Sequence, residues 1–285
     1  MKKPLLGAHV SFLKDTQLLG TIEMLKEINA TSGAMYISNS RGYKKTFEID
    51  DKQTELAFAL AKDINIDPRN IIVHAPMVGN LANIEFEKQT WILTVESYIK
   101  DLQKMHQVGL KYYNFHPGSA KDQELGIKQC AKGINKILAA TATHKTVLLI
   151  ETMMTKGNFI GKNFAQIKEI ISLVKDQTRI GVCLDTCHVW DGGYDIKTDL
   201  EGVLNSFDKE IGLKNLKAMH INDSKNVLGS GKDRHELIGQ GYIGLDALKA
   251  IVNHEQLRML PKALETPYGK DDYRKWSLEI EMLLE

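Results

Sequence analysis

Apolar residues follow two alternating patterns along this chain. Short apolar runs, often β-branched, are typical of buried strands, and each precedes a longer segment whose apolar residues recur with the period of an amphipathic helix. The predicted strands are 5–10, 34–37, 70–74, 112–116, 146–151, 179–185, 216–221 and 260–265. The predicted helices are 15–28, 52–64, 86–108, 122–140, 164–175, 200–211, 245–252 and 273–284.

Eight consecutive strand–helix units within 285 residues favour an α/β fold in which the strands close into a (β/α)8, or TIM, barrel. We expect one domain over residues 1–285, because no linker or low-complexity tract interrupts the units. An open, doubly wound parallel sheet is the alternative, since it is built from the same units.

Composition and charge narrow the class of protein. With 43% hydrophobic residues, the chain can bury a large core, and no apolar run is long enough to span a bilayer. The first residues lack the apolar region of a signal peptide. The odd cysteine count, Cys130, Cys183 and Cys187, favours a reducing cytoplasm and thiols that pack as small core residues. With a net charge of +1, a nucleic-acid partner would require local positive charge from a patch or from metal ions.

Six predicted strands end on a residue type that ligates divalent metals, and a seventh reaches His9 near its end. In a barrel, all of these residues would converge on one mouth. Each of them alone is more typical of an ordinary loop residue, but burying them together would be costly without cations. We therefore predict a metal cluster. The six strand-end residues are His74, His116, Glu151, Asp185, His220 and Glu265.

A second group of ligand types lies in loops. His188 follows Asp185 by three residues, and Asp233 and His235 lie in the long loop after the seventh strand. An Asp and a His two apart in an extended segment can bind one ion from the same side. That pair is a weak signal alone, but beside His188 it would complete a set of three ligands.

A glycine-rich stretch, 239–244, fits the pattern G-x-G-x-x-G. It follows a polar loop rather than a strand, and no acidic residue follows in a βαβ unit, so we exclude dinucleotide binding. We interpret these glycines as tight-turn residues.

At these residues the sequence resembles endonuclease IV, the trinuclear-zinc apurinic/apyrimidinic (AP) endonuclease family of DNA base-excision repair. The resemblance covers nearly the whole chain, in order and at similar spacing. The matching stretches are 7–11, 114–119, 181–188, 220–224, 233–235, 239–244 and 264–267.

The resemblance implies three Zn²⁺ per chain, with Mn²⁺ or Fe²⁺ also able to enter some sites. It implies that Glu151 is the catalytic carboxylate and bridges the first two ions. The implied ligand sets are His74, His116 and Glu151; Glu151, Asp185, His220 and Glu265; and His188, Asp233 and His235.

The implied activity is hydrolysis of the phosphodiester 5′ to an abasic site by a metal-activated water, leaving a 3′-OH and a 5′-deoxyribose phosphate. The resemblance also implies a 3′-repair phosphodiesterase, and it admits 3′–5′ exonuclease activity. The expected partner is double-stranded DNA with abasic sites or blocked 3′ ends. We expect a monomer that acts in the cytoplasm and does not bind a membrane.

Two loops are expected to contact DNA. The segment with Arg41 and Tyr43 resembles the one with which the family reaches into the duplex. After His74-Ala-Pro, Met77, Val78 and Gly79 stand where family members commonly carry an aromatic and a bulky aliphatic residue. Because Met is flexible and Val is short, we expect weaker discrimination for abasic DNA and more reliance on Arg41 and phosphate contacts.

Two other functions remain open. Glu151, Asp185, His220 and Glu265 alone would suit a sugar isomerase or epimerase, but the set with His188 would then have no role. A DNA-binding barrel without catalysis is the second alternative, and a complete ligand set argues against it. Cleavage of a duplex with one tetrahydrofuran site would separate all three.

Overall fold

Eight parallel strands form the centre of the molecule. The computed structural model describes residues 3–43, 47–85, 89–268 and 270–285. The sheet order is β1-β10-β7-β6-β5-β4-β3-β2, and a parallel bridge between His9 and Ala34 joins its two edges. The strands are β1 (Gly7–Ala8), β2 (Gly33–Met35), β3 (Ile71–His74), β4 (Tyr112–Phe115), β5 (Val147–Glu151), β6 (Ile180–Asp185), β7 (Leu216–Ile221) and β10 (Lys262–Leu264). This closure confirms the TIM barrel and excludes the open doubly wound sheet.

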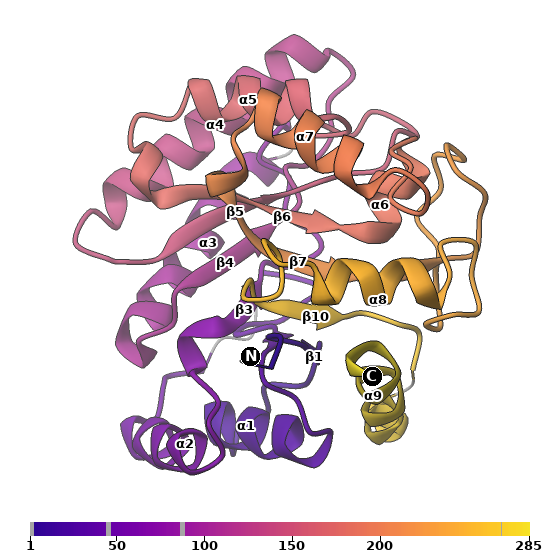
Figure 1. The fold of residues 1–285 in the computed structure, drawn as a ribbon. Coiled ribbons are helices and arrows are strands. Elements are labelled where there is room, and N and C mark those ends of the chain that lie inside the picture. The colour runs from indigo at the N-terminus through magenta and orange to yellow at the C-terminus, as the bar shows by residue number, and fades with distance from the viewer. Residues whose placement is uncertain (1–2, 44–46, 86–88, 269) are drawn as a thin grey trace.

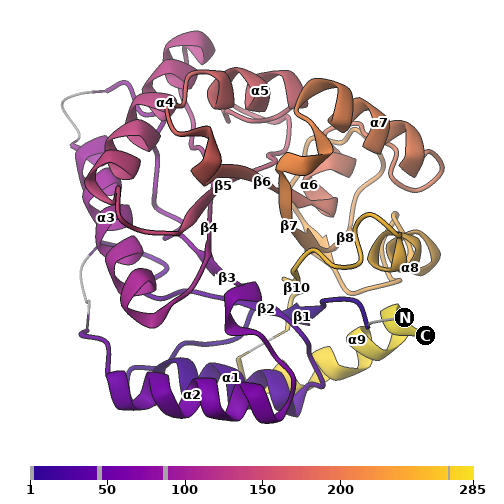
Figure 2. The same cartoon turned by 60° about the vertical axis from the view of Figure 1, so that its left-hand side comes forward.

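Helices surround the strands on the outside of the barrel (Figures 1 and 2). Those that follow the barrel strands are α1 (Gln17–Glu27), α2 (Asp51–Asp63), α3 (Thr90–Val108), α4 (Gln123–Ala140), α5 (Phe164–Ser172), α7 (Leu200–Glu210), α8 (Leu245–Asn253) and α9 (Trp276–Leu284). Within the described ranges, none of the helices combines the length and apolar composition needed to cross a membrane.

Three helix boundaries differ from the prediction by more than two residues. α3 begins at Thr90, and residues 86–88 of the predicted helix lie outside the described part of the chain. α5 ends at Ser172 because the side chain of Asn135 on α4 binds the Leu173 carbonyl and the Lys175 amide, which draws the chain away from the helical path. α9 is preceded by a 3₁₀ helix, Lys270–Lys275, so its α-helical part starts later than expected.

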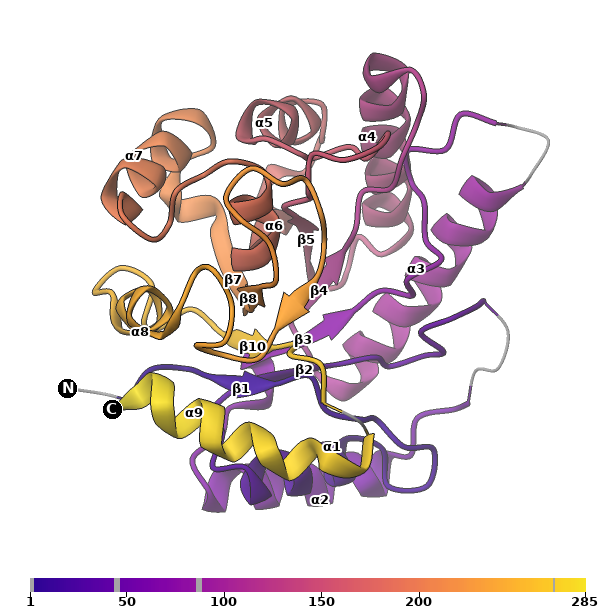
Figure 3. The same ribbon diagram turned by 90° about the vertical axis from the view of Figure 1, so that its right-hand side faces the viewer.

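Two further elements at the barrel mouth were not predicted. A short helix, α6 (Thr186–Asp191), directly follows β6. A two-stranded hairpin, β8 (Asp223–Ser224) and β9 (His235–Glu236), follows β7 and lies outside the barrel sheet. Figure 3 shows α6 and β8 beside the ends of the barrel strands.

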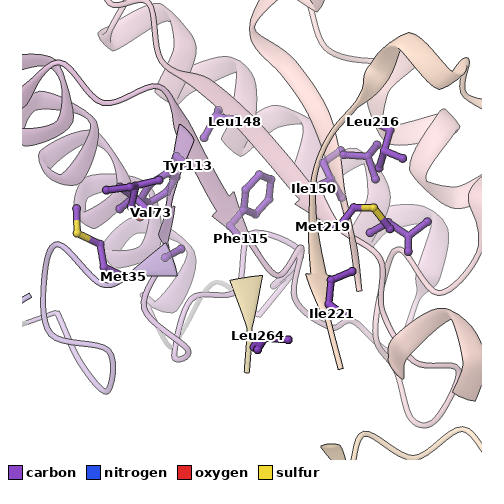
Figure 4. Packing of buried hydrophobic residues seen from close by; sticks show 14 of the residues in the cluster. Met35, Val73, Tyr113, Phe115, Leu148, Ile150, Leu216, Met219, Ile221 and Leu264 are labelled. Carbon is purple, nitrogen blue, oxygen red and sulfur yellow. The ribbon is translucent and has the colours of Figure 1, made fainter. Parts of the chain in front are cut away.

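The core has two layers, because successive side chains of a strand point to opposite faces. The outer layer packs the barrel against the helices, and Figure 4 shows Val73, Ile150, Met219 and Leu264 in it. The inner cluster comprises Ala34, Ile72, Tyr112, Val147, Leu149, Cys183, Ala218 and Ala263.

This alternation determines what reaches the barrel mouth. On five strands, the residue two positions after an inner-cluster residue is Glu151, Asp185, His220, Glu265 or His74. Each therefore has the parity of the barrel interior at the carboxyl end of its strand, where TIM barrels carry their active sites.

Candidate metal centre at the barrel mouth

The nine predicted ligand residues lie in three adjoining groups. Within each group the ligand atoms lie within 4.8 Å of one another. Glu151 belongs to two of the groups, as the resemblance implies for a bridging carboxylate. The groups are His74, His116 and Glu151; Glu151, Asp185, His220 and Glu265; and His188, Asp233 and His235.

Glu151 lies at the centre and is fully buried. Its Oε2 atom is 3.3 Å from His74 Nε2 and 3.2 Å from His116 Nε2. Its Oε1 atom is 3.1 Å from His220 Nδ1. The two oxygens of this carboxylate therefore face different groups, which is the geometry needed to link two cations.

Buried amide side chains orient the carboxylates of the first two groups. Asn114, at an inward position of β4, donates to Glu151 Oε2. Asn222, just beyond β7, donates to Asp185 Oδ2 at 2.7 Å and accepts from the Glu265 amide at 2.8 Å. Outer partners of this kind fix how a ligand presents its free oxygen.

The third group depends on α6. Asp185 caps this helix: its Oδ1 accepts a hydrogen bond from the His188 amide at 2.9 Å, and its Oδ2 lies 3.8 Å from His220 Nδ1 of the second group. One helical turn therefore carries His188 into the mouth. Its Nε2 atom is 3.4 Å from Asp233 Oδ2, and His235 Nε2 is 3.2 Å from Asp233 Oδ1.

Backbone carbonyls set the orientation of three histidine rings. Nδ1 of His74 is 2.7 Å from the Ala75 oxygen, Nδ1 of His188 is 2.7 Å from the Thr152 oxygen, and Nδ1 of His235 is 3.1 Å from the Glu265 oxygen. A carbonyl only accepts, so each Nδ1 carries the proton in the neutral ring and Nε2 is left as a lone-pair donor.

Three ring nitrogens of the candidate ligands are buried without a hydrogen-bond partner. They are Nε2 of His188, His220 and His235. Orphaned buried polar atoms are rare in native proteins and require an explanation. A cation bound by the Nε2 atoms of His188 and His235 would satisfy both, and a set of imidazoles and carboxylates without thiolate suits Zn²⁺. The residues present thus fit the implied metal.

The electrostatics of the mouth favour cations. Burial alone would lower the pKa of His188, but the carboxylates of Asp185, Asp233 and Glu151 raise the pKa to about 10. Burial would likewise lower the pKa of His235, but the Asp233 carboxylate raises this pKa to about 9. Without metal, these imidazoles hold protons as substitute cations.

The carboxylates respond in the opposite direction. Burial would raise the pKa of Glu151, but His116 and His220 hold it well below its usual range. His220 and His9 likewise keep the pKa of Glu265 low against the effect of burial. Both acids therefore remain ionised at neutral pH and are available as ligands.

A cavity of about 960 Å³ opens above this centre. Arg41 and Met77 lie on its rim with Tyr36 and the ligand histidines. The two predicted DNA-contacting loops are joined, because the Met77 amide donates to the Ser40 carbonyl at 2.8 Å. Met77 and Val78 are 51% and 41% exposed, so their apolar side chains are available to a partner.

Tyr43 has an additional structural role. Its hydroxyl donates to the Val78 carbonyl at 2.9 Å and lies 2.8 Å from Thr94 Oγ1. This arrangement fastens the loop with Arg41 to the loop with Met77 and to α3. The sequence prediction treated Tyr43 as a DNA contact and did not foresee these bonds.

The cysteines are buried free thiols, as predicted. Cys187 Sγ also lies within 4.8 Å of ligand atoms of Asp185 and His235. It donates to Asp191 Oδ2 at 3.4 Å, and burial raises the pKa of its thiol. Cys187 therefore stays protonated and offers no thiolate.

Sequence reasoning missed the orienting residues Asn114 and Asn222. A signal was available, because both lie at or just beyond strand ends, within stretches that matched the family. Amides are poor metal ligands beside carboxylates and imidazoles, so a search for ligand types passed over them.

Comparisons with known proteins show the family of this chain. The model of a family described as Xylose isomerase-like TIM barrel matches residues 22–285. The chain is 40% identical to a probable endonuclease 4 of Acholeplasma laidlawii, covering 98% of this chain and 94% of that protein. It is 41% identical to a probable endonuclease 4 of Clostridium botulinum, covering 98% and 97%.

Solved structures with a similar fold were also found. Endonuclease IV from Thermus thermophilus superposes with a TM-score of 0.84 at 29% identity and 97% coverage of both chains. A D-tagatose 3-epimerase-like protein superposes with a TM-score of 0.68 at 17% identity. The second likeness concerns the fold alone.

Proposed function

Because this chain belongs to the endonuclease IV family, we propose that it repairs DNA by hydrolysing the phosphodiester 5′ to an abasic site with three bound metal ions. It is a hydrolase of the deoxyribonuclease IV type. The products would be a 3′-OH and a 5′-deoxyribose phosphate. The same centre would remove blocking groups from 3′ ends, because these groups are attached through phosphate ester bonds. Release of single nucleotides from 3′ ends, a 3′–5′ exonuclease activity, would use the same chemistry.

The observation that carries this proposal is the third ligand group. A sugar isomerase or epimerase would need only Glu151, Asp185, His220 and Glu265. Here His188, Asp233 and His235 add a group beside them, and Nε2 of both histidines is buried without a hydrogen-bond partner. A function that uses a single cation would leave this third group, with its two buried imidazole nitrogens, without a role.

The chain's own residues divide the work. When bound, the ions would supply Lewis acidity toward a phosphodiester and lower the pKa of a water. Glu151 links two of the groups through its separate oxygens. Asp233 approaches both His188 and His235 from the solvent side, with its side chain 36% exposed. It would thus hold one ion at the edge of the cavity where substrate enters.

Recognition of DNA is assigned to the rim. Arg41 is exposed at the cavity and is suited to a phosphate. Met77 and Val78 would enter the gap left when the base-less nucleotide leaves the stack, a movement that costs less for an unpaired nucleotide. We propose that the protein does this as a monomer in the cytoplasm, where its three free thiols would persist.

Purified protein is expected to contain three zinc-type ions per chain and to cut a duplex at one tetrahydrofuran site. Elemental analysis and gel analysis of the 5′ incision measure the two properties. The same duplex with an intact nucleotide is the control. A content near one ion with full activity would eliminate the trinuclear centre, and turnover of a ketose without incision would favour an epimerase.

Met77→Tyr is expected to tighten binding of abasic DNA by roughly 5-fold or more, since stacking on a base contributes about 1–3 kcal/mol. Binding of undamaged duplex should change little. Titrations of matched abasic and intact duplexes at one salt concentration measure the preference.

Met259→Tyr is the matched control for this change. Met259 is 45% exposed and lies just before β10, at the opposite end of the barrel from the mouth. An equal or weaker preference for abasic DNA in Met77→Tyr would show that Met77 does not occupy the gap or already fills it as well as an aromatic residue.

A further inference from the structure

Asp223 is a buried carboxylate whose charge is stabilised by backbone amides. It has no solvent exposure. Its two oxygens accept hydrogen bonds of 2.9–3.3 Å from the amides of Ser224, Gly239, Gly241, Ile243 and Gly244. In the described part of the chain no ion pair reaches it, so these amides carry the compensation for its charge.

This arrangement explains the glycine-rich stretch that resembled a dinucleotide motif. Gly239 and Gly244 have φ of +78° and +87°, which L side chains rarely adopt. A Cβ on Gly241 would lie 2.4 Å from Asp223 Oδ1. The glycines therefore bend the chain around an internal anion. The ring of amides holds the protein's own carboxylate in place of a phosphate.

The carboxylate sits at the base of the hairpin that carries two of the candidate ligands. In the pairing of β8 with β9, Asp223 is opposite Glu236, and Ser224 is opposite His235. Asp233 lies two residues before His235 in the same segment. The amide ring closes residues 223–244 into one loop, so Asp223 determines where β8, and with it β9, can lie.

Two other buried acids attach this loop to the body of the protein. Asp191 on α6 accepts from the hydroxyls of Ser224 and Ser230. Glu279 on α9 accepts from the Ile238 amide at 2.8 Å. Each of these binds the loop at one or two points, whereas Asp223 joins its beginning to its end.

We propose that Asp223 is a positioning residue that holds Asp233 and His235 in place to face His188. The inference rests on the proposed function, because it takes those three residues as the ligands of one ion. Preorganisation lowers the cost of binding that ion: an exposed loop would otherwise have to be ordered at the moment of binding. Asp223 touches neither the ion nor the substrate in this arrangement.

The test is Asp223→Asn, which keeps the size of the side chain. An amide presents hydrogens where the carboxylate accepts, so several loop amides lose their acceptor. We expect the affinity of the third group for its ion to fall roughly 10- to 100-fold, which is the usual effect of losing a residue that orients a ligand. The metal content should fall from three to two per chain after dialysis against a weak chelator. Added zinc should restore both the third ion and incision.

Asp101→Asn is the matched control. Asp101 is also buried and accepts from Ser38 and Tyr113, away from the hairpin. This variant should keep three ions even if it is destabilised. Hydrogen exchange provides a readout independent of metal count: peptides over 225–236 should lose protection in Asp223→Asn, with the barrel strands unchanged.

The outcomes are separable. If the wild-type protein holds fewer than three ions, the proposed metal count is wrong. Hydrogen exchange of the hairpin in Asp223→Asn then still decides the role of Asp223. The positioning role would be overturned if Asp223→Asn matched Asp101→Asn both in hydrogen exchange of the hairpin and in the number of ions retained. If Asp223→Asn does not fold, Gly241→Ala tests the same point, since its methyl group would displace the carboxylate.

Discussion

Glu151→Ala should reduce incision of abasic DNA by more than about 100-fold, because loss of an outer partner alone costs roughly 10- to 100-fold. The change removes a buried carboxylate whose two oxygens face different groups, Oε2 toward His74 and His116 and Oε1 toward His220. It should therefore disturb two ions at once. Incision rates with elemental analysis of the same samples measure both effects.

Two variants control this experiment. Glu151→Gln keeps the shape but removes the charge, so it should retain more metal than Glu151→Ala and still lose most activity. Asp101→Asn changes a buried carboxylate on α3 that belongs to none of the three ligand groups, and this variant should keep its ions. Incision near the wild-type rate in Glu151→Ala, or loss of a single ion, would contradict the bridging role.

Removal of the metal should abolish incision and reverse the pH dependence of stability. In the metal-free protein the pKa of His188 is about 10 and that of His235 about 9, against an ordinary value of 6.5. A raised folded-state pKa contributes stability that is complete below about pH 6.5 and is lost as the pH rises through about 9–10. The melting temperature of chelator-treated protein should thus fall over that interval.

At acidic pH, the stability of the metal-free protein changes with pH in the opposite direction. The lowered pKa values of Glu151 and Glu265 contribute stability above about pH 4.5, which is lost as the pH falls further. Metal-free protein should therefore be most stable between about pH 4.5 and 6.5. Metal-loaded protein should gain from rising pH, because ions require unprotonated imidazoles.

Thermal unfolding of both forms from about pH 5 to 10 measures this difference. A loss of about 1 kcal/mol corresponds to roughly 2–4 °C for a domain of this size class. His188→Gln should flatten the metal-free curve, whereas His254→Gln, a residue paired with the exposed Glu201, should leave it unchanged. A metal-free melting temperature that is constant above about pH 6.5 would show that these histidines are not held as imidazolium ions.

Much of the fold and of the first two ligand groups could be predicted from local patterns. Alternation with period two determines which side of a strand each residue faces. Parallel strands end at one edge of a barrel. A carboxylate or imidazole at the inward position of a strand end, such as Glu151 or His220, therefore has its place set by its own strand. These two rules require no knowledge of which strands are neighbours.

The residues of the third group were predicted from the sequence, but their positions and supports depended on the tertiary structure. His188 reaches the mouth because Asp185 caps a single helical turn, and Asp233 arrives on a hairpin closed around Asp223. Tyr43, predicted to contact DNA, is fastened to Val78 and Thr94. Loops have no repeating period that fixes their path, so contacts between residues far apart in the chain determine where these side chains lie. The chain by itself specified the barrel and its inward-facing ligands; packing and buried hydrogen bonds decided how the loops complete the site.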